Sequence, residues 1–179
     1  MASILRLLGL GPGGSRRNPP GETETVRMIA ERLEGLPPEE ARFLAAFAYV
    51  LARVANADLS IDTAETEAME RIVREVAGLG DSEAALVVEI ARTRSRLLGG
   101  TEDYVVTREF RRIATPEQRA RLLECLHAVA AADGTISSEE AAAIAAIGEE
   151  LGFTRAEVIA FRSAWRDRLS VLRGPEPGS

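Results

Sequence analysis

Cysteine, histidine, lysine and aromatic residues are scarce or absent in this 179-residue chain. The single cysteine, Cys125, excludes an intramolecular disulfide framework. Together with the single histidine, His127, it cannot complete a closed zinc site. On a helix of about 3.6 residues per turn these two side chains point roughly 200° apart, so they cannot form a nucleophile–base pair. We expect Cys125 to be a small buried hydrophobe and His127 to lie at the helix surface or at the edge of the core.

Motifs of common enzyme classes are also missing. The sequence has neither a phosphate-binding Gly-rich loop nor a nucleophile elbow, and adjacent carboxylates such as Glu139 and Glu140 do not face one another on a helix. No apolar run approaches the length of a membrane span. Residues 4–10 are apolar but too short, and broken by Arg6, for a secretory signal. We therefore expect a non-enzymatic, cytoplasmic protein.

The composition favours helices over sheets. Sustained alternation of apolar and polar residues is absent, and aromatic residues make up only 4% of the chain. Apolar residues make up 46%, many of them alanine, as in closely packed helices. The length suffices for one domain with a substantial core. With a net charge of −6, nucleic acid is not an expected partner.

The chain is organised around one acidic stretch, residues 131–140, with the sequence Ala-Ala-Asp-Gly-Thr-Ile-Ser-Ser-Glu-Glu. A degenerate copy lies 75 residues upstream, at residues 56–65. In that copy Asp58, Ile61 and Glu65 correspond to Asp133, Ile136 and Glu140. The two copies predict an internal repeat.

Helix punctuation alone explains both stretches. Gly134 supplies a residue that ends a helix in the left-handed conformation, and Ser137 with Glu140 forms a capping box for the next helix. Asp62 and Glu65 take the same two roles in the upstream copy. Under this interpretation the carboxylates only end one helix and begin another.

The alternative is a cation site. The stretch has the second half of an EF-hand loop, namely a glycine, an isoleucine two residues later and a glutamate six residues after the glycine. The first half is missing, because Val129 and Ala131 stand where carboxylates are needed. The pattern therefore favours a weak oxygen site, with Asp133 and Glu140 completed by carbonyl oxygens and water, over a full EF-hand.

Apolar periodicity predicts an all-α fold, a helical bundle of about seven to eight helices built from two pseudo-twofold-related helix-turn-helix repeats. Buried central helices are expected over residues 38–58 and 115–133, with Thr115 and Thr154 as caps. Asp81 or Ser82 should begin another helix. The predicted organisation is an N-terminal apolar segment and linker (1–21), a helical domain (22–173) with a first repeat (37–98), a connecting helix (101–114) and a second repeat (115–172), and a polar tail (174–179).

Two further segments invite partner hypotheses. Residues 92–121 contain eight arginines and four acidic residues in an otherwise acidic chain. They form either a solvated face paired with nearby acids or a surface for an anionic partner. Residues 1–10 either dock on the body or make a weak contact with a membrane or a partner. The last helix should place Val158, Ile159 and Phe161 inside or half inside.

The chain resembles the TerB-like domain family, named for a tellurite-resistance protein and found also at the front of DjlA-type co-chaperones. The resemblance rests on the motif at residues 130–140, on its upstream copy and on Leu-Gly-Phe at residues 151–153. Asp103-Tyr104 and Pro116-Glu117-Gln118-Arg119 look like the linker of an uncharacterised bacterial branch of this family. The resemblance covers residues 38–165.

This resemblance implies a twofold-repeated helical module for binding or regulation, associated with stress or the cell envelope, with an unknown protein partner. It also implies acidic sites for a divalent cation, for which Ca²⁺ or Mg²⁺ fits better than Zn²⁺. The implied ligands are Asp58 and Glu65 in one site, with Asp62 as an extra donor, and Asp133 and Glu140 in the other. Leu59 departs from the glycine usual in the family. The alternatives are a structural interaction domain and an adaptor for an anionic partner.

Overall fold

The computed structural model describes residues 20–55, 63–97, 103–132 and 136–172, and within them the side chains of 27–54, 66–93, 104–132 and 136–164. This part of the chain is all-α, as predicted, with eight helices and no strand. The candidate cation ligands Asp58, Asp62 and Asp133 lie outside the described residues, as do residues 1–19 and the tail beyond 172. The helices are α2 (Pro20–Glu34), α3 (Pro38–Ala55), α4 (Thr63–Ala77), α5 (Asp81–Leu97), α6 (Asp103–Ile113), α7 (Pro116–Ala130), α8 (Ser138–Glu150) and α9 (Arg155–Leu172).

Helix α3 is the centre of the fold. Every side chain from Leu44 to Ala52 is buried, and the helix contacts α2, α5, α6, α7 and α8. Its alanines allow close approach on several sides, whereas its large residues fill the core. Phe43 and Phe47 pack with Phe110 of α6, with ring centroids 5.4 and 6.0 Å away. Helix α6 is thereby fixed on α3.

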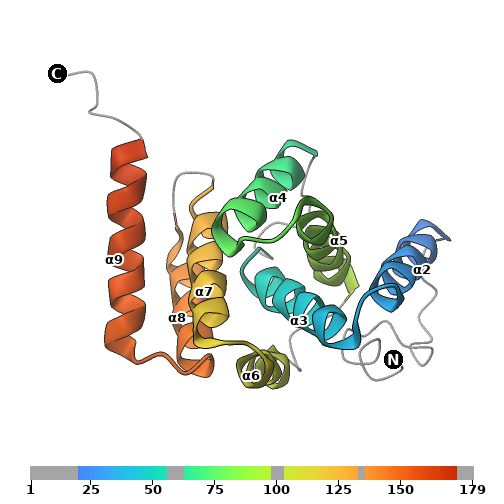
Figure 1. Ribbon diagram of the computed structural model, residues 1–179. Helices are drawn as coiled ribbons and strands as arrows, with labels where there is room; N and C mark the ends of the chain where they lie inside the picture. Colours follow the sequence, from blue (N-terminus) through green and yellow to red (C-terminus); the bar gives the residue numbers. More distant parts are fainter. Residues whose placement is uncertain (1–19, 56–62, 98–102, 133–135, 173–179) are drawn as a thin grey trace.

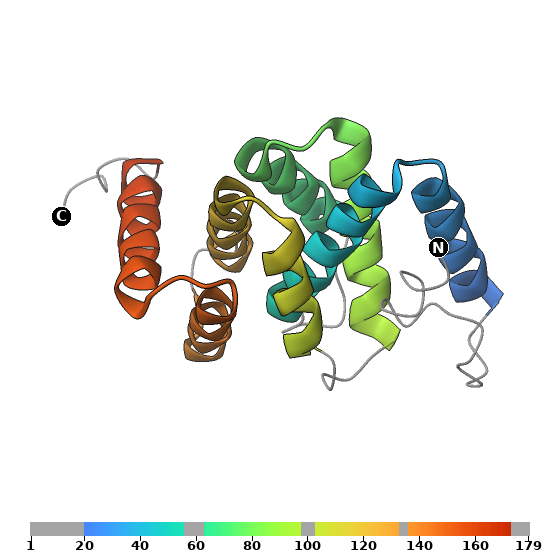
Figure 2. The same cartoon turned by 60° about the horizontal axis from the view of Figure 1, so that its bottom comes forward.

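The helices are spread along one direction, with α2 at one end and α9 at the other in both views (Figures 1 and 2). Helix α2 packs on α5 and α3, and α9 packs on α7 and α8. Helices α4 and α3 contact α7, and thus join the first predicted repeat to the second. The contact of α3 with α5 is more extensive than that of α7 with α9. The pseudo-twofold relation of the repeats stays a prediction.

Two predicted helix boundaries differ from the structure. Helix α5 begins at Asp81, so neither Asp81 nor Ser82 is its cap; the Gly80 N–H instead donates to the side chain of Glu83 at 2.7 Å. Helix α7 ends at Ala130 rather than at Asp133, with Ala131 as its C-cap. None of the described helices is both long and apolar enough to cross a membrane.

Gly148 brings α7, α8 and α9 together. A Cβ atom at this position would lie 2.6 Å from Val158 Cγ2 of α9 and 3.6 Å from Leu123 Cδ1 of α7. Valine is rigid about χ1, so α9 can sit at this distance from α8 only because residue 148 has no side chain.

We expect Gly148→Ala to lower the free energy of unfolding by about 1 kcal/mol, because overpacking outweighs the gain in helix propensity. Val158→Ala in the same chain should remove the clash, so the double variant should lose less than the sum of the two single losses. Urea unfolding measures all three values. Additive losses would contradict the contact.

Candidate functional site

The predicted capping box before α8 is confirmed. The backbone N–H of Ser137 donates to Glu140 Oε2 at 2.8 Å, and the Glu140 N–H donates to Ser137 Oγ at 3.1 Å. Glu140 Oε1 makes no hydrogen bond with the described residues. Glu65 lies in α4, but its side chain is outside the described residues. The pairing of Asp133 with Glu140, and of Asp58 with Glu65, stays a prediction.

The junction between α7 and α8 is too short for a full EF-hand loop. Helix α7 continues to Ala130, so only residues 131–137 separate it from α8. Val129, at the position of the first EF-hand ligand, lies within α7 and is half-buried, and Ala131 is a buried C-cap. Among the described residues, no group of three or more Asp, Glu, His or Cys side chains could hold a metal ion. Any cation site here depends on residues 133–135.

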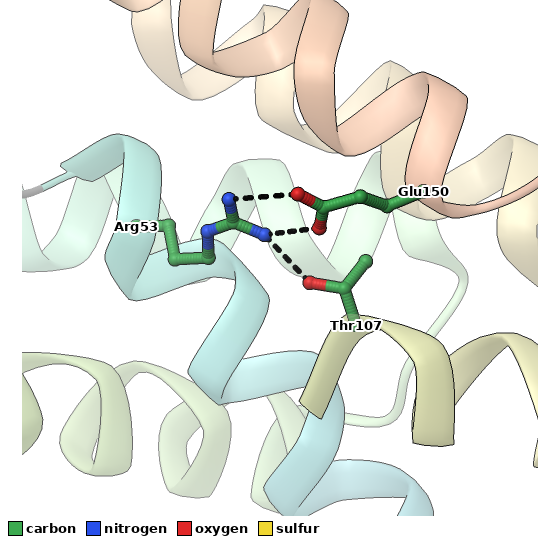
Figure 3. A network of polar contacts seen from close by, with 3 residues as sticks. All are labelled: Arg53, Thr107 and Glu150. Atoms are coloured by element: carbon green, nitrogen blue, oxygen red, sulfur yellow. Dashed lines mark hydrogen bonds and ion pairs between the residues drawn. The ribbon is translucent and has the colours of Figure 1, made fainter. Parts of the chain in front are cut away.

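A polar network links three helices at the end of α8 (Figure 3). Arg53, in the last turn of α3, holds Glu150 in the last turn of α8 with both terminal nitrogens, at 2.6 and 3.3 Å. Arg53 Nη1 also donates to Thr107 Oγ1 of α6 at 2.7 Å. The side chains of Arg53 and Glu150 are only 15% and 16% exposed, so the pair is largely removed from water. The sequence analysis missed this network.

The same end of α8 is held by two further arginines. Arg119 Nη1 donates to the carbonyl oxygen of Leu151 at 3.0 Å, in place of a helical partner for that group. Gly152 has φ +95°, and a Cβ atom there would lie 2.8 Å from Arg111 Nε. The Leu-Gly-Phe segment is thus a helix end whose carbonyl dipoles face positive charge.

Cys125 and His127 are both buried in α7, which has neighbours on several sides. The prediction for Cys125 is confirmed: burial raises the pKa of its thiol to about 12. The prediction that His127 lies at the surface or the core edge is wrong, since the residue is 3% exposed. Burial, and then the charge of Arg162, lower the pKa of its imidazole to about 4. Neither ring nitrogen has a hydrogen-bond partner.

The arginines of residues 92–121 are divided among α5, α6 and α7. Arg112 forms an ion pair with Glu109 at 2.7 Å, and this hydrogen bond holds the pKa of Glu109 below its ordinary value. The guanidinium of Arg108 lies over the ring of Tyr104, 5.3 Å from its centroid. Part of the segment is thus a face paired with its own acids, as one interpretation held.

Comparison with known proteins gives one match. The family model described as "Tellurite resistance protein TerB" matches residues 43–163, about two thirds of the chain. Neither the search of curated proteins nor the search of solved structures found a match. The matched region runs from α3 into α9 and contains both acidic stretches and the whole polar network. The chain belongs to the TerB tellurite resistance protein family.

Proposed function

We propose that this protein is a non-enzymatic binding or regulatory module, in a stress- or envelope-associated context in the cytoplasm, with weak divalent-cation sites at its acidic helix junctions. The family assignment supports a TerB-like module. The observation that carries the cation proposal is the geometry of Glu140. Its Oε2 is fixed by the Ser137 N–H, whereas its Oε1 is left without a partner among the described residues.

A carboxylate held in this way can serve two purposes. An EF-hand also places its last glutamate at the start of the exiting helix, where one side chain contributes to both the cap and the ion. Oxygen ligands alone favour Ca²⁺ or Mg²⁺ over Zn²⁺. The proposed ligands are Asp133 and Glu140 at the second junction and Asp58, Asp62 and Glu65 at the first.

The cation proposal predicts a specific effect of Asp133→Asn with Glu140→Gln. Glutamine still reaches the cap backbone, so the fold should survive, but the two charges that attract a cation are gone. In the unchanged protein, Ca²⁺ at a hundredfold excess over its Kd should stabilise the fold by about 2.7 kcal/mol, a rise in Tm of about 5–10 °C. The double variant should lose the part of this rise that belongs to the second junction.

Glu139→Gln is the matched control, because Glu139 is exposed, adjacent to Glu140 and outside the capping box. It should leave the Ca²⁺-dependent rise in Tm unchanged. An equal rise in the double variant would mean that Asp133 and Glu140 only punctuate helices. The purely structural interaction domain would then be the better proposal.

We propose no catalytic role for any residue. The proposal is supported by the two ordinary candidates for nucleophile and base. Cys125 is buried with a raised thiol pKa, so it carries little thiolate at neutral pH. His127 is buried two residues further along the same helix and therefore points away from it.

The second candidate function is an adaptor for an anionic protein partner, and one face of α6 favours it. Tyr104 and Val105 are 55% and 58% exposed, and the exposed Arg108 and Arg111 follow them along the same side of the helix. Such a face suits a segment that combines apolar and acidic side chains. Binding of a polyglutamate peptide that weakens with salt and is lost in Arg108→Glu would favour this function over cation binding.

A further inference from the structure

Helix α9 is the least buried helix with described side chains at its contact face. Of the ten described side chains from Arg155 to Ala164, eight are exposed, Phe161 is half-buried and only Val158 is buried. Helix α9 contacts α7 and α8 but lies apart from the central helix α3 (Figure 1). Phe161 packs edge-on against Phe153, which belongs to the turn leading into α9 rather than to α7. The core thus loses little apolar contact when α9 moves away.

The buried imidazole of His127 lies on the side of α7 that faces α9. One turn earlier, Leu123 and Val158 both approach Gly148, which places α7 beside α9 at that level. His127 and Arg162 each stand four residues further along their helices, and the charge of Arg162 reaches the imidazole. Both ring nitrogens lack a hydrogen-bond partner, so an added proton would find no acceptor there.

The other helices packed on α7 supply no charge to stabilise an imidazolium. Helix α8 faces α7 with the buried residues Ile144, Ile147 and Gly148. Glu140 and Glu150 of the same helix are engaged with Ser137 and Arg53. No charged group from α3, α4 or α8 within the described side chains acts on the imidazole, and Arg162 of α9 repels its charged form.

We propose that the contact of α9 with α7 is a proton-sensitive switch, in which protonation of His127 releases α9 while the helices from α2 to α8 stay folded. A buried imidazolium without a partner is unfavourable, and release lets water solvate it. Release also removes the repulsion by Arg162 and uncovers the apolar side of α7 and α8 around Leu123 and Ile144. This switch is independent of the proposed cation sites.

Hydrogen exchange of the full-length protein at pH 7.5 and pH 5.0, corrected for intrinsic exchange rates, tests the switch. The imidazole has a pKa of about 4 when α9 is docked and about 6.5 when it is free in water. Free α9 is therefore favoured as pH falls below about 6.5. Opening of α9 at pH 5.0 should increase roughly 10- to 30-fold over pH 7.5, whereas protection of α3 and α5 should stay unchanged.

Two variants make the result specific. His127→Leu and His127→Gln cannot take up a proton, so both should show no pH-dependent opening of α9; the second serves if the first fails to fold. Arg162→Gln should reduce the effect, because the docked imidazolium is no longer repelled. The proposal is overturned if α9 protection does not change with pH, if α3 and α5 lose protection together with α9, or if His127→Gln opens as the unchanged protein does.

Discussion

Arg53→Met is expected to lower the free energy of unfolding by about 2–4 kcal/mol, because it leaves Glu150 largely buried without its partner. The guanidinium of Arg53 makes two contacts with that carboxylate and one with Thr107, so a single substitution opens the junction of α3, α6 and α8. The effect should appear in urea unfolding as a lower midpoint without a change in slope.

Two further variants separate the pair from its surroundings. Arg53→Met with Glu150→Met removes both charges, so it should lie within about 1 kcal/mol of the unchanged protein. Arg74→Met is the matched control, since Arg74 pairs with Asp81 at 3.0 Å but the two side chains are 45% and 84% exposed. It should cost less than about 1 kcal/mol. Equal losses for Arg53→Met and Arg74→Met would show that burial adds nothing to the network.

Phe110→Ala is expected to cost about 3–5 kcal/mol, because it empties the space between α3 and α6. Phe110 is fully buried, and its ring meets Phe43 and Phe47. Val105→Ala on the same helix is the control: Val105 is 58% exposed, so its truncation should change stability by no more than about 0.5 kcal/mol. Thermal unfolding of both variants provides the comparison. Similar losses would mean that α6 is not held by its inner face.

Local features of the fold could be predicted from the sequence because their determinants are neighbours in the chain. The capping boxes at Thr115 and Ser137, and the equivalent cap at Thr154, depend on residues three positions apart. The burial of α3 follows from its nearly continuous apolar sequence. The all-α class follows from helical periodicity together with the lack of alternating runs.

Long-range features could not be predicted. Arg53 and Glu150 are 97 residues apart, and nothing local distinguishes them from the solvated arginines and glutamates elsewhere. His127 is buried because α7 has helices on several sides, which a single amphipathic stripe does not indicate. Ile159 was expected inside or half inside but is 57% exposed, because α9 is covered on one side only. Both errors arise from the position of an element in the fold.

The candidate cation sites were predicted from residue type and spacing, and the structure adds the fixed orientation of Glu140. A capping glutamate and a ligand glutamate look the same in sequence, because both need a carboxylate at the third position of the helix. Helix geometry therefore cannot separate the two roles, and only the response to a cation can.

Calorimetric titration of the metal-free protein with Ca²⁺ tests the central proposal most directly. We predict saturable heat with a stoichiometry of one or two ions per chain, the number reporting whether the junction with Leu59 in place of glycine also binds. Mg²⁺ should compete at the same sites, since both ions take oxygen ligands. The absence of saturable heat for either ion would contradict the proposal and leave Asp133 and Glu140 as parts of a helix junction.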